Sequence, residues 1–117
     1  MENEKKLAES KLFTPYKLGS TTLRNRVIRS AAFESMGKDF APTQALKDYH
    51  VSVAKGGVGM TTVAYASINR SGISFNKQLW LRDEIVPALR DLTDAVHNEG
   101  AAVGIQLGHC GNMTHWS

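Results

Sequence analysis

The chain has 117 residues, of which 42% are hydrophobic and 21% charged, so its composition fits one ordinary globular domain and excludes disordered and collagen-like chains. Its single cysteine excludes an internal disulfide and no apolar run is long enough to span a membrane, so we expect a cytoplasmic protein. The net charge of +3 arises in the first thirty residues, where basic side chains are too sparse for a nucleic-acid groove, so we expect a solvated tail and no nucleic-acid partner.

The chain begins with a charged leader and a predicted β-hairpin. Residues 1–11 lack an apolar segment, which predicts a disordered, frayed or weakly helical leader and excludes a secretory signal. Short β-prone runs on either side of Gly19-Ser20 predict a hairpin. A buried strand is then predicted at residues 27–32. We expect residues 12–117 to form the globular part of the chain, an incomplete amino-terminal part of a larger domain.

The first predicted helix follows Thr43, whose hydroxyl suits an N-cap. Apolar side chains recur at helical spacing behind it, at Leu46, Tyr49 or His50, and Val53. Gly56-Gly57 supplies a left-handed stop, and the β-branched run at residues 58–68 predicts a strand directly after it.

The second predicted helix begins near Pro87 and ends before Gly100. Its apolar stripe consists of Leu89, Leu92 and Val96. The apolar run at residues 101–107 then predicts a third strand. Strands that alternate with helices indicate a parallel sheet covered by helices, which doubly wound sheets and (β/α) barrels share. No phosphate-binding glycine-rich turn follows the first strand, and this favours a barrel.

The third strand ends in polar groups that are costly to bury without partners, within VGIQLGHCGN at residues 103–112. In a barrel the carboxyl ends of the strands form the active site, so we expect Gln106 and His109 to face its mouth. The alternatives are a Gln106 that caps a backbone group and a His109 that is a buried scaffold residue. Cys110 is expected to pack inertly. A metal site built from His109, Cys110 and His115 lacks paired ligand spacing, so we expect no metal.

Three segments at predicted strand ends carry a family resemblance. They are LRNRVIRSAAFES, GGVGMTTVAYASI and GIQLGHCGN. In this order they resemble the amino-terminal part of the Old Yellow Enzyme family of FMN-dependent NAD(P)H:flavin oxidoreductases, over residues 12–113. The resemblance implies an eight-stranded (β/α) barrel with FMN at its carboxyl face. It also implies NADH or NADPH as reductant and a small-molecule acceptor such as an electron-poor alkene.

The resemblance further implies a set of cofactor-binding residues. These are Ser30, Ala31, Ala32, Phe33, Tyr65 and Gln106. The backbone of the first four would lie along the flavin ring, and the Gln106 carboxamide would pair with the pyrimidine edge of the flavin. The sequence departs from the family pattern at Ala31, where proline is usual, and at Asn112, where arginine is usual. Glu34 and Ser35 are interpreted as solvated loop residues, with an approach to the substrate as the alternative.

Two functions remain open at this point. With about three of eight strands, the chain is expected to be an amino-terminal part of an FMN oxidoreductase whose catalytic residues and phosphate site lie beyond Ser117. The alternative is a noncatalytic α/β fragment that pairs with the remainder of the barrel, or that forms a homo-oligomer through open strand edges. A third possibility, an unrelated phosphate-binding barrel, would require phosphate loops outside this sequence.

Overall fold

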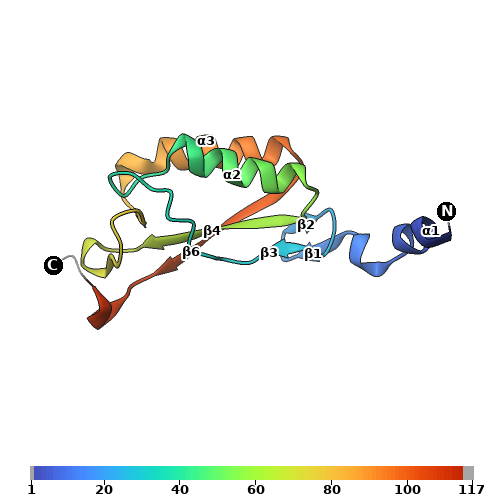
Figure 1. Ribbon diagram of the computed structural model, residues 1–117, viewed down its shortest axis with the longest axis horizontal. Coiled ribbons are helices and arrows are strands. Elements are labelled where there is room, and N and C mark those ends of the chain that lie inside the picture. The colour runs from blue at the N-terminus through green and yellow to red at the C-terminus, as the bar shows by residue number, and fades with distance from the viewer. Residues whose placement is uncertain (1, 115–117) are drawn as a thin grey trace.

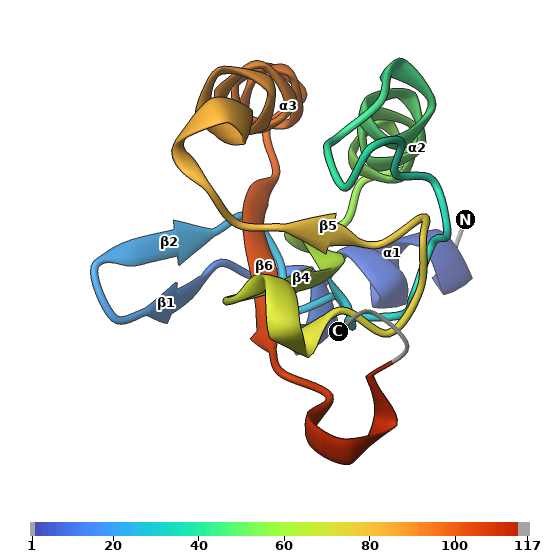
Figure 2. The same cartoon turned by 90° about the vertical axis from the view of Figure 1, so that its left-hand side faces the viewer.

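The computed structural model describes residues 2–114, which form an elongated molecule of 58 × 27 × 26 Å. Helices α2 (Gln44–Lys55) and α3 (Val86–Asn98) lie side by side on one face of a sheet (Figures 1 and 2). The leader forms a short helix, α1 (Glu2–Ala8), which buries no residue and extends away from the sheet (Figure 1). Within residues 2–114, no helix combines the length and apolar character that crossing a membrane requires.

The predicted hairpin is confirmed and is tied to the helical layer by an arginine. Strands β1 (Tyr16–Leu18) and β2 (Thr21–Leu23) pair antiparallel around Gly19, whose φ of 59° suits glycine at this tight turn. Arg24 follows directly. Its guanidinium donates to the carbonyls of Val58, Ala54 and Glu99 at 2.7–3.1 Å. Because Ala54 and Glu99 lie at the carboxyl ends of α2 and α3, this cation satisfies carbonyls where helix dipoles favour positive charge.

The sheet is built on one long central strand. Strand β4 (Met60–Ser67) pairs in parallel with β3 (Ile28–Arg29) and with β6 (Ala102–Gly108). Met60 is the register partner of residues in both neighbours, so β4 lies between them. Strand β5 (Leu79–Trp80), which the sequence did not predict, pairs with the carboxyl end of β4. The predicted order of strands and helices is confirmed, and the described residues form an open sheet.

Strand β3 is shorter than the sequence predicts. Residues 27–32 were expected to be extended within the sheet, but the ladder ends after Arg29. The chain then runs without regular structure along the carboxyl edge of β4 as far as residue 37. Side-chain contacts of Arg29 and Glu34, described below, replace the strand pairing there.

The helices pack their predicted apolar faces on the sheet. Thr43 caps α2 by accepting a hydrogen bond from the Leu46 N–H at 3.1 Å, as predicted. Gly57, with φ of 104°, provides the left-handed stop, whereas Gly56 is right-handed. The buried core contains Leu46, Ala54, Val63, Ala66, Leu79, Leu92, Val96 and Ala101. It lies between the helices and the sheet, and within residues 2–114 helices α2 and α3 both cover this one face (Figures 1 and 2).

The cap at Thr43 gives a first test of the fold. Thr43→Ala removes the acceptor for the Leu46 N–H, so we expect the free energy of unfolding to fall by about 1 kcal/mol. Chemical denaturation measures this change. Thr93→Ala is the matched control, because the Thr93 hydroxyl donates only to a carbonyl within α3. A cap variant as stable as this control would contradict the role of Thr43.

Candidate functional site

A β-bulge lies where β4 and β6 approach their carboxyl ends. Val63 pairs with Ile105 and Ala66 pairs with Leu107, so two residues of β4, Ala64 and Tyr65, lie opposite Gln106 alone. Bulges of this kind bend a strand and redirect its side chains, and they are frequent beside active sites. Here the bulge brings Tyr65 next to the residue that the sequence singled out most strongly.

The structure brings the predicted cofactor-binding residues to one edge of the sheet. Residues 30–33 follow β3, Tyr65 lies near the end of β4 and Gln106 lies near the end of β6. Because the three strands are parallel, their carboxyl ends meet at this edge. Every one of these side chains is exposed or half-buried, in contrast to the core on the helical side.

Unpaired polar groups face this edge. Among residues 2–114, the Gln106 carboxamide has no hydrogen-bond partner, so the alternative of a glutamine that caps a backbone group is not realised here. The N–H groups of Ala31, Ala32 and Phe33 likewise have no partner within that range. A carboxamide offers both a donor and an acceptor, and free N–H groups offer donors. The edge can therefore bind a ligand that presents both kinds of group.

A hollow and an aromatic wall adjoin these polar groups. The hollow has a volume of about 230 Å³ and is lined by Tyr65, Gly72, Ser74, Gln106, Gly108, His109 and Cys110. The Phe33 ring lies 5.1 Å from the Tyr65 ring and stacks on the Phe75 ring at 5.2 Å. Phe33 is 37% exposed and Phe75 48% exposed, so the wall presents open aromatic surface. Apolar rings beside a few polar groups are typical of sites for flat organic ligands.

His109 has a scaffold role at the rim of the hollow. Its Nδ1 accepts the Gly111 N–H at 3.0 Å, so the neutral ring carries its proton on Nε2, which lies 3.0 Å from the Ser71 Oγ. A Cβ added at Gly72 would lie 2.5 Å from the ring, so only glycine allows this approach. These contacts are those of a scaffold residue, but the ring is exposed and lines the hollow, so the expected burial of His109 is wrong and a contact with a ligand stays a prediction.

The neighbouring Cys110 is half-buried at the same rim. Between residues 2 and 114, no group of three potential metal ligands among histidine, cysteine, aspartate and glutamate comes together. His115, the third member of the metal site considered from the sequence, lies outside the described residues.

The interpretation of Glu34 as a solvated loop residue is wrong, because its side chain is only 1% exposed. Its carboxylate contacts Arg29 Nη1 at 3.0 Å, His50 Nε2 at 2.8 Å and the Ala64 N–H at 3.1 Å. His50, which is fully buried, places its Nδ1 2.8 Å from the Thr61 Oγ1. We call Arg29, Glu34, His50 and Thr61 the buried polar cluster. It lies directly beneath the carboxyl edge that carries Tyr65.

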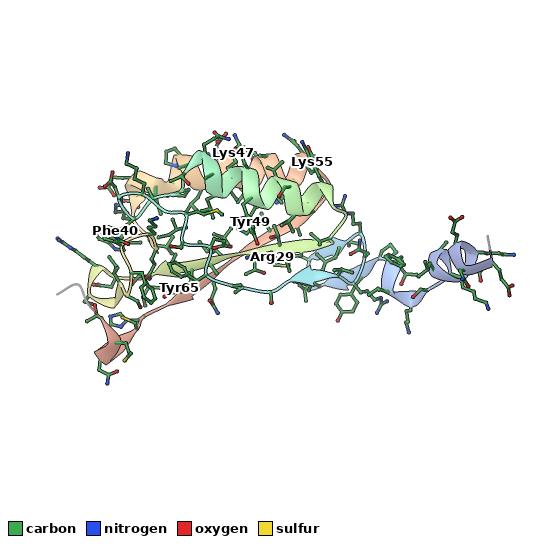
Figure 3. All side chains as sticks on the ribbon, in the orientation of Figure 1. Arg29, Phe40, Lys47, Tyr49, Lys55 and Tyr65 are labelled. Atoms are coloured by element: carbon green, nitrogen blue, oxygen red, sulfur yellow. The ribbon has the colours of Figure 1, made fainter. Side chains whose placement is uncertain are left out.

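The arginine of this cluster lies between α2 and the sheet. Its guanidinium is stacked over the Tyr49 ring at 5.0 Å (Figure 3). It also donates to the carbonyls of Thr62 at 2.7 Å and Ala32 at 3.2 Å. The cluster was missed because its members come from separate elements. A histidine at a helix position that must face the core was the one available signal for it.

A second arginine, which follows β5, binds the loop that follows β3. Asp39 and Phe40 adopt left-handed conformations, with φ of 52° and 58°, in a turn closed by backbone bonds between Lys38 and Ala41. Arg82 donates to the carbonyls of Asp39 at 2.9 Å and Phe40 at 3.1 Å, and it stacks over the Trp80 ring at 4.8 Å. One guanidinium thus holds a turn whose conformation is uncommon for residues other than glycine.

Comparison with known proteins supports a single family. Residues 11–116 match the NADH:flavin oxidoreductase / NADH oxidase family. The chain is 43% identical over 100 residues to 4,4'-dithiodibutanoate disulfide reductase from Rhodococcus erythropolis, covering 86% of this chain and 25% of that protein. It is 40% identical over 106 residues to an NADPH dehydrogenase from Listeria welshimeri, covering 87% of this chain and 31% of that protein.

A solved structure agrees with these matches. Morphinone reductase in complex with tetrahydroNAD superposes with a TM-score of 0.80 at 26% identity, over 92% of this chain and 29% of that one. The chain therefore spans about a quarter to a third of the length of the proteins it matches. The expected fold, an amino-terminal part of such a barrel enzyme, is confirmed.

Proposed function

This chain belongs to the NADH:flavin oxidoreductase / NADH oxidase family, and we propose that it forms the flavin-facing amino-terminal strands of an FMN-dependent oxidoreductase. Members of this family use FMN together with NADH or NADPH. The observation that carries the proposal is the set of unpaired polar groups beside an aromatic wall, at the carboxyl ends of parallel strands. When bound, FMN supplies hydride transfer from NAD(P)H to an acceptor.

The residues present fit the chemistry of FMN. The pyrimidine edge of the flavin presents adjacent donors and acceptors, and the Gln106 carboxamide, which has no partner among residues 2–114, complements both. The N–H groups of residues 31–33, likewise without a partner in the described part of the chain, can donate to the ring from the end of β3. The adjacent rings of Tyr65 and Phe33 would exclude water from one side of a bound flavin. Ser30, Ala31 and Ala32 contribute through their backbone, so small side chains are suitable there.

The substrate proposed for the complete enzyme is a small molecule that accepts hydride, such as an electron-poor alkene. The exposed aromatic surface of Phe33 and Phe75 suits a flat, conjugated acceptor. A cytoplasmic location is part of the same proposal, since the lone cysteine implies no disulfide framework.

The protein that carries this chain provides the test. We expect it to bind FMN, to show the visible flavin absorbance, and to lose that absorbance when NADH or NADPH is added without oxygen. Flavin absorbance and anaerobic reduction are measured in one cuvette. A purified, folded protein that neither retains nor rebinds FMN would refute the proposal.

The outer edge of β6 supports a second proposal, on association. Among residues 2–114, β6 pairs with β4 alone, and Leu107 near its end is 52% exposed. Unpaired strand edges favour pairing with another chain. We expect the isolated chain to form dimers or larger species through this edge, as sedimentation over a range of concentrations would show.

A matched pair of variants localises the contact. Leu107→Lys places a charge at the β6 edge and is expected to shift the chain towards monomer. Leu7→Lys, on α1 and 58% exposed, should leave association unchanged. A native chain that stays monomeric at every concentration would show that the edge does not associate.

A further inference from the structure

We propose that Glu34 is a positioning residue for the cofactor site, because its carboxylate holds the ends of two strands in the arrangement that the flavin would contact. The inference rests on the proposed function for the identity of the ligand. It concerns the buried polar cluster, none of whose members lines the hollow. Its effect on a ligand therefore has to pass through the backbone that it holds.

The first step is the connection that one carboxylate makes. Glu34 directly follows the segment 30–33, and both of its oxygens lie within 3.3 Å of the Ala64 nitrogen. Ala64 is the first residue of the bulge and Tyr65 is the second. One carboxylate therefore joins the segment after β3 to the bulge of β4, although the two are thirty residues apart in sequence.

The second step concerns Arg29, which extends the connection. Its guanidinium binds Glu34 and, at the same time, the carbonyls of Ala32 and Thr62. With the Ala32 carbonyl held by Arg29, the N–H groups of Ala31 and Phe33 remain without partners among residues 2–114. Arg29 thus fixes one carbonyl of this segment, and the N–H groups on either side of that residue stay available to a ligand.

The third step is that the site requires a carboxylate rather than an amide. The Arg29 guanidinium and the Ala64 N–H are donors, and beside a carboxylate the His50 Nε2 is a donor as well. With His50 neutral, its Nδ1 then accepts the Thr61 hydroxyl proton. A carboxylate accepts all of these bonds. Arg29 and His50 both bind Oε1, so a glutamine can keep its amide oxygen there. Its NH₂ group then replaces Oε2 and faces the Ala64 N–H, so Glu34→Gln keeps the shape of the side chain but weakens the connection to the bulge.

The experiment measures local order and ligand binding separately. For Glu34→Gln we expect amide hydrogen exchange at Ala64 to become faster while the amides of α3 keep their native rates. We expect the dissociation constant for FMN, measured by quenching of its fluorescence, to rise about tenfold, which corresponds to the loss of one or two hydrogen bonds. Glu84→Gln is the matched control, because the Glu84 side chain is 77% exposed, and it should leave both quantities unchanged.

Two results would overturn the proposal. One is a folded Glu34→Gln protein with native FMN affinity and native exchange at Ala64. The other is faster exchange that is uniform along the chain, which would mean that Glu34 acts on stability alone. If the native protein binds no FMN, the proposed function fails. The comparison of amide exchange at Ala64 between the native protein and Glu34→Gln would still show whether Glu34 positions the strand ends.

A second pair of variants applies if Glu34→Gln does not fold. Thr61→Val removes the hydroxyl that His50 Nδ1 contacts and keeps the side-chain volume, whereas Thr61→Ser keeps the hydroxyl. We expect Thr61→Val to accelerate amide exchange at Ala64 and to weaken FMN binding. Thr61→Ser should keep the native exchange rate and the native FMN affinity. Equal behaviour of the two variants would refute the positioning role.

Discussion

Replacing Arg29 with methionine is expected to lower the free energy of unfolding by about 3 kcal/mol, because it leaves a buried carboxylate without its cation. The Glu34 side chain is 1% exposed and would retain only its contacts with Ala64 and His50. The carbonyls of residues 32 and 62 would also lose their donor. A loss of this size is a large fraction of the roughly 5–15 kcal/mol that stabilises a typical domain.

Denaturant unfolding monitored by circular dichroism measures the effect of this substitution. Arg90→Met is the matched control, because Arg90 is an exposed residue of α3 whose side chain makes no hydrogen bond or ion pair with other residues between 2 and 114. We expect the control to change stability by no more than about 0.5 kcal/mol. Equal stability of the two variants would show that the arginine contributes little to the buried polar cluster.

Replacing Gln106 with leucine is expected to weaken FMN binding by about 1–3 kcal/mol, which is roughly fivefold to 150-fold in the dissociation constant. The leucine would place an apolar group against the pyrimidine edge of the flavin. Stability should be unchanged, because Gln106 is exposed and its carboxamide has no partner among residues 2–114. Fluorescence titration gives the affinity, and thermal unfolding of the protein without FMN gives the stability.

The variant Gln106→Glu separates the effect of the side chain's hydrogen bonds on FMN affinity from the effect of its shape. Glutamate has the size of glutamine but accepts without donating, so we expect affinity between that of the native protein and that of the leucine variant. Stopped-flow reduction by NADH or NADPH provides a second measurement on the same proteins. Native affinity and native reduction rates in both variants would refute the assignment of Gln106.

The sequence predicted those parts of the fold that depend on neighbouring residues. The turn at Gly19, the cap at Thr43 and the end of α3 before Gly100 are local signals, and each was confirmed. Strand β5 was missed because two residues carry no periodicity and their pairing with β4 is a tertiary contact. The bulge was missed for the same reason, since it exists only relative to β6.

The candidate site divides in a similar way. The position of Gln106 at the carboxyl edge followed from strand direction, which the alternation of strands and helices determines. The burial of Glu34 depends on Arg29 from β3 and His50 from α2. These partners meet only in the folded chain, so the local sequence around Glu34 could not predict its burial. The proposed contacts of Tyr65 and Gln106 with FMN stay predictions.

The hydrogen bonds from Arg82 to the carbonyls of Asp39 and Phe40 bear on how such enzymes could be redesigned. Loops at the carboxyl edge of a barrel are the usual segments to exchange when a new specificity is sought. Here one guanidinium binds carbonyls of the loop after β3 from a position that follows β5, so neither loop is an independent module. A chimaera that imports residues 38–41 without Arg82 would import a turn without its support. The two loops and this arginine form the smallest unit that can be transplanted together.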